Sequence, residues 1–300
     1  MSGSLVNAVF LQFLTGLQLG AIYALIALGL TLIFGTLGVV NFAHGALYSI
    51  AAYAAVIVAG KIGFTAAIVV VPILLFFVGL LLERGLIQYF YSRPHTDQIL
   101  VTFGVAIVVE EGLKWIFGSN NIPFPTPAWG GGIVRLHEYF PFLEGFVAFP
   151  KWRLILIGVS LAVIVALFLL LQFTRFGLVV RAGMRDAEMV SLLGVNITRR
   201  FAAVFGIGAL IAGIAGVFGG PITQVTPGVG MQLLVPSFLV VVIGGMGSMT
   251  GALIAAVMLG MALAFSAEYS AIQQIIIYLV AVVVLLARPR GLLGKKGIFE

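Results

Sequence analysis

The sequence predicts an all-α, polytopic membrane protein, a bundle of about eight to ten transmembrane helices. Of its 300 residues, 62% are hydrophobic and 9% are charged, and the mean hydropathy is +1.21. A soluble domain carries about a quarter charged residues, so this composition excludes that class. Nine apolar segments have about the 20 residues that a helix needs to cross a bilayer.

These nine predicted spans follow one another along the whole chain. They cover residues 8–35, 37–60, 62–82, 98–118, 153–173, 201–219, 233–248, 251–267 and 271–287. The first is long enough that we expect it to tilt or kink, and the residues before it lack the basic charge of a signal peptide. In the sixth, Gly206, Gly208, Gly213 and Gly216 have the spacing of small residues that lets helices approach closely, which predicts a packed bundle. We therefore expect residues 1–300 to form a single transmembrane domain.

Basic residues predict the orientation of the chain in the membrane. Eleven of the sixteen lie in residues 83–97, 174–200 and 288–300, so the positive-inside rule places these segments in the cytoplasm and the N-terminus on the other side. The net charge is +6, but the basic residues lie at the ends of apolar segments rather than among aromatics, so nucleic acid is not an expected partner. The chain has no cysteine, which excludes disulfides, thiolate catalysis and cysteine-ligated metals.

Residues 119–152 form the longest loop predicted outside the cytoplasm. Pro123, Pro125, Pro127 and the glycines at 130–132 preclude a long helix there. The aromatic residues of the loop suit a segment at the membrane surface. Either it docks a partner or it rests on the lipid head groups.

The long charged loop 174–200 contains a predicted short amphipathic helix. Residues 186–193 place Ala187 and Val190 on one face with Leu192 and Leu193, and Gly194 is a typical residue after a helix end. The loop also contains five arginines, Arg175, Arg181, Arg185, Arg199 and Arg200. This segment is either a helix gripped by a cytoplasmic partner or a solvated loop whose arginines only fix the topology.

Five polar residues in or beside the predicted spans are candidates for function. Asn41 is expected to accept hydrogen bonds at the start of the second helix. His44 is either a titratable functional group or, as we prefer, a hydrogen-bonded structural residue. Glu110, Glu111 and Lys114 bring costly charges into the fourth span. They line an outer vestibule, relay protons, or form an ion pair that fastens two helices.

A glycine-rich segment, 244–251, separates the seventh and eighth spans. Gly244, Gly245 and Gly247 lack the Lys-Ser/Thr that a phosphate-binding Walker loop needs, so we do not expect the chain itself to hydrolyse ATP. Hydrolase signatures of the Gly-x-Ser-x-Gly and His-Glu-x-x-His types are absent from the sequence. The prediction is a chain that is not an enzyme and binds no cofactor.

Five stretches, in this order along the chain, resemble the LivH-type permeases of branched-chain amino acid ABC importers. They are Leu25–Thr31 running into Gly38–Gly45, Glu83-Arg84 followed by Arg93-Pro94, Arg181–Val195, Gly244–Gly251 and Arg288–Gly294. The resemblance implies a type II ABC importer permease of the bacterial inner membrane, working by alternating access with ATP hydrolysed by its partners. Those partners would be a second, LivM-like permease subunit, two cytoplasmic ATP-binding subunits and a periplasmic substrate-binding protein, with membrane lipid around them.

The resemblance also assigns roles to residues. In that family a loop between two late spans carries a helix that couples the permease to an ATP-binding subunit. The matching positions here are Arg185, Asp186, Glu188, Ser191, Gly194, Arg199 and Arg200. Candidates for the translocation path or gate are Asn41, His44, Glu110, Glu111, Gly244, Gly245 and Gly247.

Two features depart from the family pattern, Ala46 after His-Gly and the Glu110-Glu111 pair in a usually more neutral span. The solute therefore stays open among branched-chain and other amino acids, urea, amides and small carboxylates. The rival function is a proton-coupled secondary transporter of the drug/metabolite type that uses Glu110 or Glu111. It predicts two related halves, and the sequence shows no convincing repeat. A scaffolding subunit without a solute path would leave Asn41, His44 and Glu110 without purpose.

Overall fold

The computed structural model describes residues 2–268 and 270–294, which are mainly helical. The α-helices in this part of the chain are α1 (Ser2–Leu37), α2 (Ala43–Ile62), α3 (Phe64–Gly85), α4 (His95–Phe117), α5 (Lys151–Phe173), α6 (Arg175–Arg185), α7 (Ala187–Leu192), α8 (Ile197–Thr223), α9 (Val229–Gly244), α10 (Met249–Phe265) and α11 (Ser270–Ala287). Short elements join them, namely the 3-10 helices η1 (Ile87–Phe90) and η2 (Leu136–Glu138) and the strands β1 (Ile133–Arg135) and β2 (Ala148–Pro150).

Each of the nine predicted spans falls on one helix, which confirms the predicted fold class. Five helices are long and apolar enough to cross a membrane on their own: α1, α2, α3, α5 and α8. Three apolar helices are shorter, α9, α10 and the part of α11 from Ile275 to Ala287. The remaining predicted span, 98–118, lies on α4, which carries the charges of Glu110, Glu111 and Lys114.

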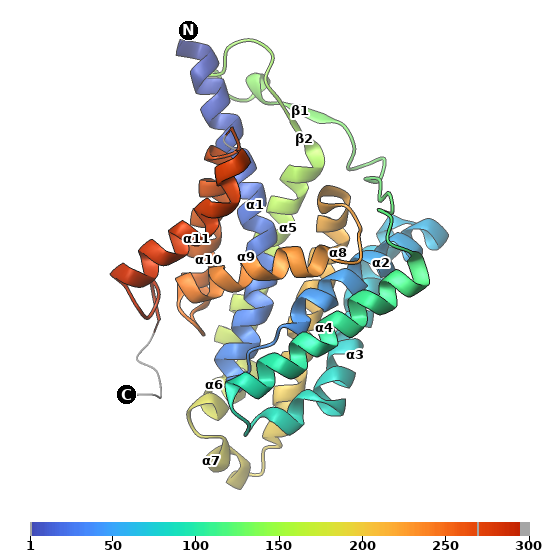
Figure 1. The fold of residues 1–300 in the computed structure, drawn as a ribbon, viewed down its shortest axis with the longest axis vertical. Helices are drawn as coiled ribbons and strands as arrows, with labels where there is room; N and C mark the ends of the chain where they lie inside the picture. The colour runs from blue at the N-terminus through green and yellow to red at the C-terminus, as the bar shows by residue number, and fades with distance from the viewer. Residues whose placement is uncertain (1, 269, 295–300) are drawn as a thin grey trace.

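Helix α1 runs along the molecule and connects two different ends (Figure 1). Strands β1 and β2 lie beside its N-terminus, and we call residues 118–150 the hairpin end. Helices α6 and α7 lie at the opposite end, and we call residues 174–196 the α7 end. Helix α9 crosses the middle of the bundle between them.

The first helix is longer than the bilayer needs. It is continuous over 36 residues, about 54 Å at 1.5 Å per residue, against a hydrocarbon core of about 30 Å. The middle of α1, from Ala21 to Ile33, is buried along its length. Its N-terminal turns instead meet the hairpin end, so the excess length lies outside the bundle core.

Glycines set the distances between helices, as their spacing predicted. Four of them let α8 approach its neighbours: Gly206, Gly208, Gly213 and Gly216. A Cβ atom at Gly213 would lie only 2.8 Å from the Pro72 Cα atom of α3, and one at Gly216 only 2.5 Å from the Ala51 Cβ atom of α2. Larger residues have no room at these crossings, so close packing of small residues holds the core together.

The hairpin end contains no long helix, as its prolines and glycines predicted. β1 and β2 pair antiparallel, with Val134 opposite Phe149. Under them lies a small buried cluster of Leu136, Leu143, Val147 and Phe149, which packs against the first turns of α1. The three-residue strands were not predicted from the sequence.

Candidate functional site

The α7 end consists of two short helices with well-defined caps. Asp186 separates α6 from α7, and its Oδ1 atom accepts a hydrogen bond from the Met189 N–H at 2.8 Å. Gly194 follows α7 with φ +81°, a left-handed conformation that favours glycine, and its N–H donates to the Ser191 carbonyl. The predicted helix and its glycine end are therefore confirmed.

The predicted apolar face of α7 is wrong. Val190 is buried, but Leu192 and Leu193 are each 77% exposed, and Met189 is 56% exposed. Leu192 lies two residues from Val190, about 200° around a helix, and Leu193 follows the last helical residue. One apolar side chain therefore anchors α7 to the protein, while three point outward.

All seven residues predicted to contact an ATP-binding subunit lie at the surface. Arg185, Asp186, Glu188, Ser191, Gly194, Arg199 and Arg200 are exposed. Within the described ranges, none of these charged side chains has an ion pair. Asn196 caps α8 by accepting from the Arg199 N–H at 3.0 Å, and Arg181 bonds back to the Leu171 carbonyl of α5. The backbone is thus held firmly while the side chains remain available.

Asn41 and His44 lie at the start of α2, where both are buried. The Asn41 Oδ1 atom accepts from the Ala43 N–H at 3.0 Å, which confirms the predicted role at the helix start. His44 is fully buried, and its ring lies 2.5 Å from where a Cβ atom of Gly29 would be. Neither of its ring nitrogens has a hydrogen-bond partner among residues 2–268 and 270–294, so the expected hydrogen-bonded histidine is not seen.

The segment before α2 is fastened to α4 by polar groups that sequence reasoning missed. The Val40 N–H donates to Gln98 Oε1 at 3.3 Å, and the Phe42 N–H donates to Thr102 Oγ1 at 3.0 Å. Gln98 also donates to the Phe90 carbonyl at 3.0 Å. The bonds from Val40 and Phe42 cross about 60 residues of sequence, so local patterns give no signal for them.

The charged residues of α4 pair within their own helix. Lys114 Nζ lies 3.0 Å from Glu110 Oε1 and 2.7 Å from Glu111 Oε1. The pair of Glu110 and Lys114 lies within one helix, as their i, i+4 spacing favours, and does not fasten two helices together. Glu110 also approaches Gly228, just before α9. The Glu111 side chain is 63% exposed.

The glycine segment 244–251 forms a tight turn that the C-terminal tail covers. Gly245 and Gly247 have φ values of +99° and +82°. The Leu292 N–H donates to the Ile243 carbonyl at 2.7 Å, and the Leu293 N–H donates to the Gly244 carbonyl at 3.1 Å. The last carbonyls of α9 are thus satisfied by residues of the tail. Lys295 and Lys296 of the predicted cytoplasmic tail lie outside the described residues.

The C-terminal end of α1 meets this turn. A Cβ atom at Gly35, near the end of α1, would lie 3.1 Å from the Gly247 Cα atom. Gly244 is closer still, because a Cβ atom there would lie 2.4 Å from the Gly251 carbonyl carbon and from the Ala252 nitrogen. Backbone segments therefore approach closely at this turn, and a role of these glycines in the translocation path or gate stays a prediction.

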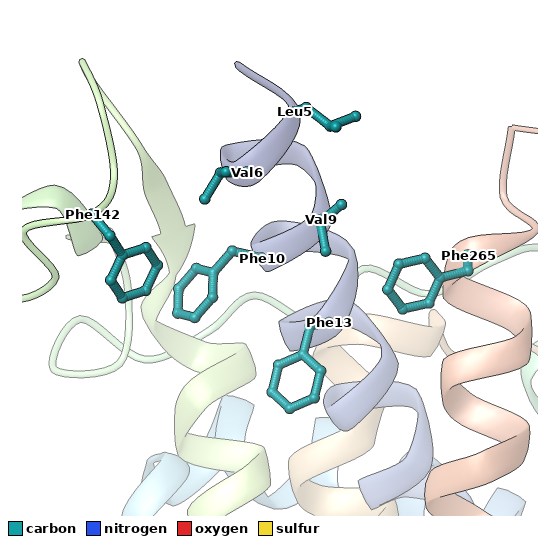
Figure 2. Close-up of a pocket in the computed structure, with 7 residues that line it drawn as sticks. All are labelled: Leu5, Val6, Val9, Phe10, Phe13, Phe142 and Phe265. Atoms are coloured by element: carbon teal, nitrogen blue, oxygen red, sulfur yellow. The ribbon is translucent and has the colours of Figure 1, made fainter. Parts of the chain in front are cut away.

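Two hollows lie on the hairpin side of the bundle. The first, about 340 Å³, is wholly apolar, and Figure 2 shows it around the first turns of α1, with Phe142 from the hairpin end and Phe265 from α10. The residues that line it are Leu5, Val6, Val9, Phe10, Phe13, Phe142 and Phe265. Without polar groups, this groove suits a hydrocarbon chain rather than a polar solute.

The second hollow, which we call the polar cavity, lies between α1, α5, α8 and α9. Its volume is about 350 Å³, and its lining mixes apolar and polar side chains. The polar ones are Thr15, Gln18, Tyr23, Arg153, Thr223 and Gln232. None of the predicted path residues lines it, so the sequence-based candidates and the cavity are in different places.

Comparison with known proteins identifies the family of the chain. A family model described as branched-chain amino acid transport system / permease component matches residues 12–287. The chain belongs to this permease family. Two curated relatives are the high-affinity branched-chain amino acid transport system permease proteins LivH of Escherichia coli (strain K12) and BraD of Pseudomonas aeruginosa. Each is 29% identical to this permease over 301 residues, covering 95% of both chains.

Likeness to a solved structure is weaker. The chain described as "PsaBC from Streptococcus pneumoniae in complex with Fab" aligns with a TM-score of 0.41 and 15% identity, covering 94% of this permease and 90% of that chain. At that score no argument rests on the likeness.

Family membership resolves the choice between transport mechanisms. The permease is a membrane-embedded, multi-pass component of a transport system, and the ATPase of such a system is a separate subunit. A proton-coupled transporter that uses Glu110 or Glu111 is therefore the wrong class, and so is a scaffold without a solute path. The permease is not an enzyme, and it works with ATP-binding and substrate-binding partners.

Proposed function

We propose that this permease forms the solute path of an ATP-driven importer for branched-chain amino acids or a related small polar solute, in a bacterial inner membrane. The match to the permease family over residues 12–287 carries this proposal. ATP binding and hydrolysis in the partner subunits would switch the bundle between two openings, so the solute crosses by alternating access.

The α7 end is the proposed contact with an ATP-binding subunit. Met189, Leu192 and Leu193 present apolar area that water does not favour, and the exposed Arg185, Arg199 and Arg200 add positive charge to the segments before and after α7. Asp186 and Gly194 fix both ends of α7, so the helix would move as a rigid body when its partner moves. Glu188 and Ser191 lie on its exposed surface and would complete the contact.

The opposite end is the proposed periplasmic side. The excess of basic residues supports a cytoplasmic α7 end and tail, with the hairpin end and the N-terminus on the other side. The hairpin end would then meet the periplasmic substrate-binding protein. The apolar groove of Figure 2 would hold membrane lipid, and a second, LivM-like permease subunit would complete the translocation path together with two ATP-binding subunits.

Purification of the tagged permease in mild detergent from its native host tests this assembly. We expect two ATP-binding subunits and a second permease to co-purify, and ATP-dependent uptake after reconstitution with the binding protein. Recovery of the permease alone, or only with copies of itself, would contradict the proposal.

Substitution of Gly194 tests the α7 contact within the same assembly. Gly194→Val forces a β-branched residue into a left-handed conformation at the end of α7. We expect uptake to fall at least tenfold while membrane insertion is unchanged, whereas Gly194→Asn, which tolerates this conformation, retains most of the uptake. Normal uptake by Gly194→Val together with normal uptake by Asp186→Arg would remove α7 from the mechanism.

A further inference from the structure

The polar cavity contains a buried amide that lacks a partner. Gln18 of α1 lines the cavity and is 2% exposed, and its Nε2 atom has no hydrogen-bond partner in the part of the chain that the structure describes. A buried N–H group without an acceptor costs free energy, so such groups are normally paired. The cavity therefore offers a donor that needs an acceptor oxygen.

Arg153 of α5 brings a positive charge to the same cavity. Its Cζ atom lies 5.8 Å from the centre of the Phe149 ring, which holds the long side chain in place. Across the described ranges, no carboxylate lies within ion-pair distance of its guanidinium. A planar guanidinium is suited to bind a carboxylate through two hydrogen bonds.

We propose that the polar cavity is a binding site for the carboxylate group of the solute. Arg153 binds the carboxylate, and the Gln18 amide donates a further hydrogen bond to it. This assignment rests on the proposed transport function and adds to it the place and the chemistry of recognition. It also adds two residues that none of the sequence patterns had singled out.

The rest of the lining selects the remainder of the solute. Leu19, Ile22, Val229 and Leu233 give the cavity an apolar wall, which suits an aliphatic side chain. Its volume of about 350 Å³ is at the lower end of the range for small-molecule sites, roughly 300 to 1,000 Å³. The expected ligand is therefore a small carboxylate with an aliphatic side chain.

The cavity also lies on the side where such a solute would arrive. Arg153 is three residues from β2, and the cavity is formed by the start of α5, the end of α8 and the start of α9. These segments belong to the half of the bundle nearer the hairpin end (Figure 1). A binding protein docked on the hairpin end would release its solute toward Arg153.

Uptake of L-leucine by the reconstituted complex provides the first test. We expect Arg153→Gln and Gln18→Leu each to lower uptake at least tenfold, and Arg153→Lys, which keeps the charge without the planar group, to lower it less. Lys151→Gln is the matched control, because Lys151 starts the same helix, lies outside the cavity lining and bonds the Trp129 carbonyl instead. Equal co-purification of the partner subunits shows that each variant folds.

A reporter thiol tests the charge of the cavity without transport. The chain has no cysteine, so Gln232→Cys places a single thiol at the cavity of this subunit, measured against the unaltered complex as background. An anionic methanethiosulfonate should react about tenfold more slowly once Arg153→Gln is added, while a cationic one should not slow. L-Leucine should protect the thiol, and L-leucinamide, which lacks the carboxylate, should not.

The two readouts separate failure of the site from failure of the function. Normal uptake by Arg153→Gln would overturn the carboxylate site, and so would a thiol that reacts at the same rates with and without Arg153→Gln. Arg153 would then be an anchor at the membrane surface. Absence of ATP-dependent L-leucine uptake by the unaltered complex would overturn the proposed transport of branched-chain amino acids. The thiol reaction would still decide whether the cavity attracts anions.

Discussion

The hairpin end has a buried core of its own beneath exposed aromatic side chains, whereas α7 has a single buried apolar anchor, Val190. Trp152, at the base of the hairpin end, is 3% exposed, and its ring stacks on Phe218 with centroids 5.7 Å apart. Its Nε1–H donates to the Phe218 carbonyl at 2.9 Å. On α7 only Val190 is buried, and Leu192 projects outward.

This difference indicates which end depends on another protein. Exposed apolar side chains mark places where lipid or a partner binds, and a segment without a buried core depends most on that contact. The hairpin end keeps its buried core by itself, although Tyr139 and Phe146 on its surface are each 70% exposed, so a binding protein can dock there and leave. The α7 end has no such core, as expected for a surface that remains in a complex.

Labelling of the two ends should give the largest contrast, because it is all or none. Tyr139→Cys at the hairpin end and Ser191→Cys on α7 each place one thiol at an exposed position of a chain without cysteine. We expect an impermeant reagent added to intact cells to modify the first and not the second. In inverted membrane vesicles the order should reverse, and labelling of Ser191→Cys from outside the cell would contradict the proposed topology.

Removal of the buried indole should break the hairpin end. Trp152→Ala leaves a cavity and removes the hydrogen bond to the Phe218 carbonyl, and we expect it to lower the free energy of unfolding by about 3 to 5 kcal/mol. Trp115→Ala is the control, because Trp115 is 88% exposed and its loss should change stability by less than about 0.5 kcal/mol. Thermal unfolding of the purified variants measures both, and equal effects would show that the hairpin end is not held by Trp152.

A charge on α7 should weaken binding of the partner without lowering the stability of the permease. Leu192→Asp should leave the unfolding temperature of the isolated permease nearly unchanged. It should weaken binding to the ATP-binding subunit by roughly 1.5 to 3 kcal/mol, the value of burying one leucine side chain, which is a factor of about ten to a hundred. Leu192→Met, which conserves volume, should bind normally. Binding assays on the purified subunits decide, and a normal affinity of Leu192→Asp would exclude α7 from the interface.

The sequence predicted the helices well because each span is a longer apolar run than a loop or a strand would contain. It also predicted the glycine contacts of α8 and the left-handed residue after α7, since both depend on local spacing. The exposed side of α7 was predicted wrongly because six residues are fewer than two turns, too few for a periodic pattern to fix a face.

Long-range contacts account for what the sequence did not predict. Gln18 and Arg153 meet in one cavity although 135 residues separate them, and Gln98 reaches Val40 across 58 residues. No local pattern records which helices become neighbours. The strands β1 and β2 were missed for the opposite reason, because three residues are too short for an alternating pattern to be visible.

The docking of the tail on the glycine turn has a consequence for biosynthesis. The carbonyls of Ile243 and Gly244 receive their hydrogen bonds from Leu292 and Leu293, which the ribosome adds almost fifty residues later. The hydrogen bonds that close the end of α9 therefore form only after α10 and α11 have been made and these residues have emerged. A chain interrupted after α11 would keep this end open, which gives a membrane protease a way to distinguish unfinished chains from finished ones.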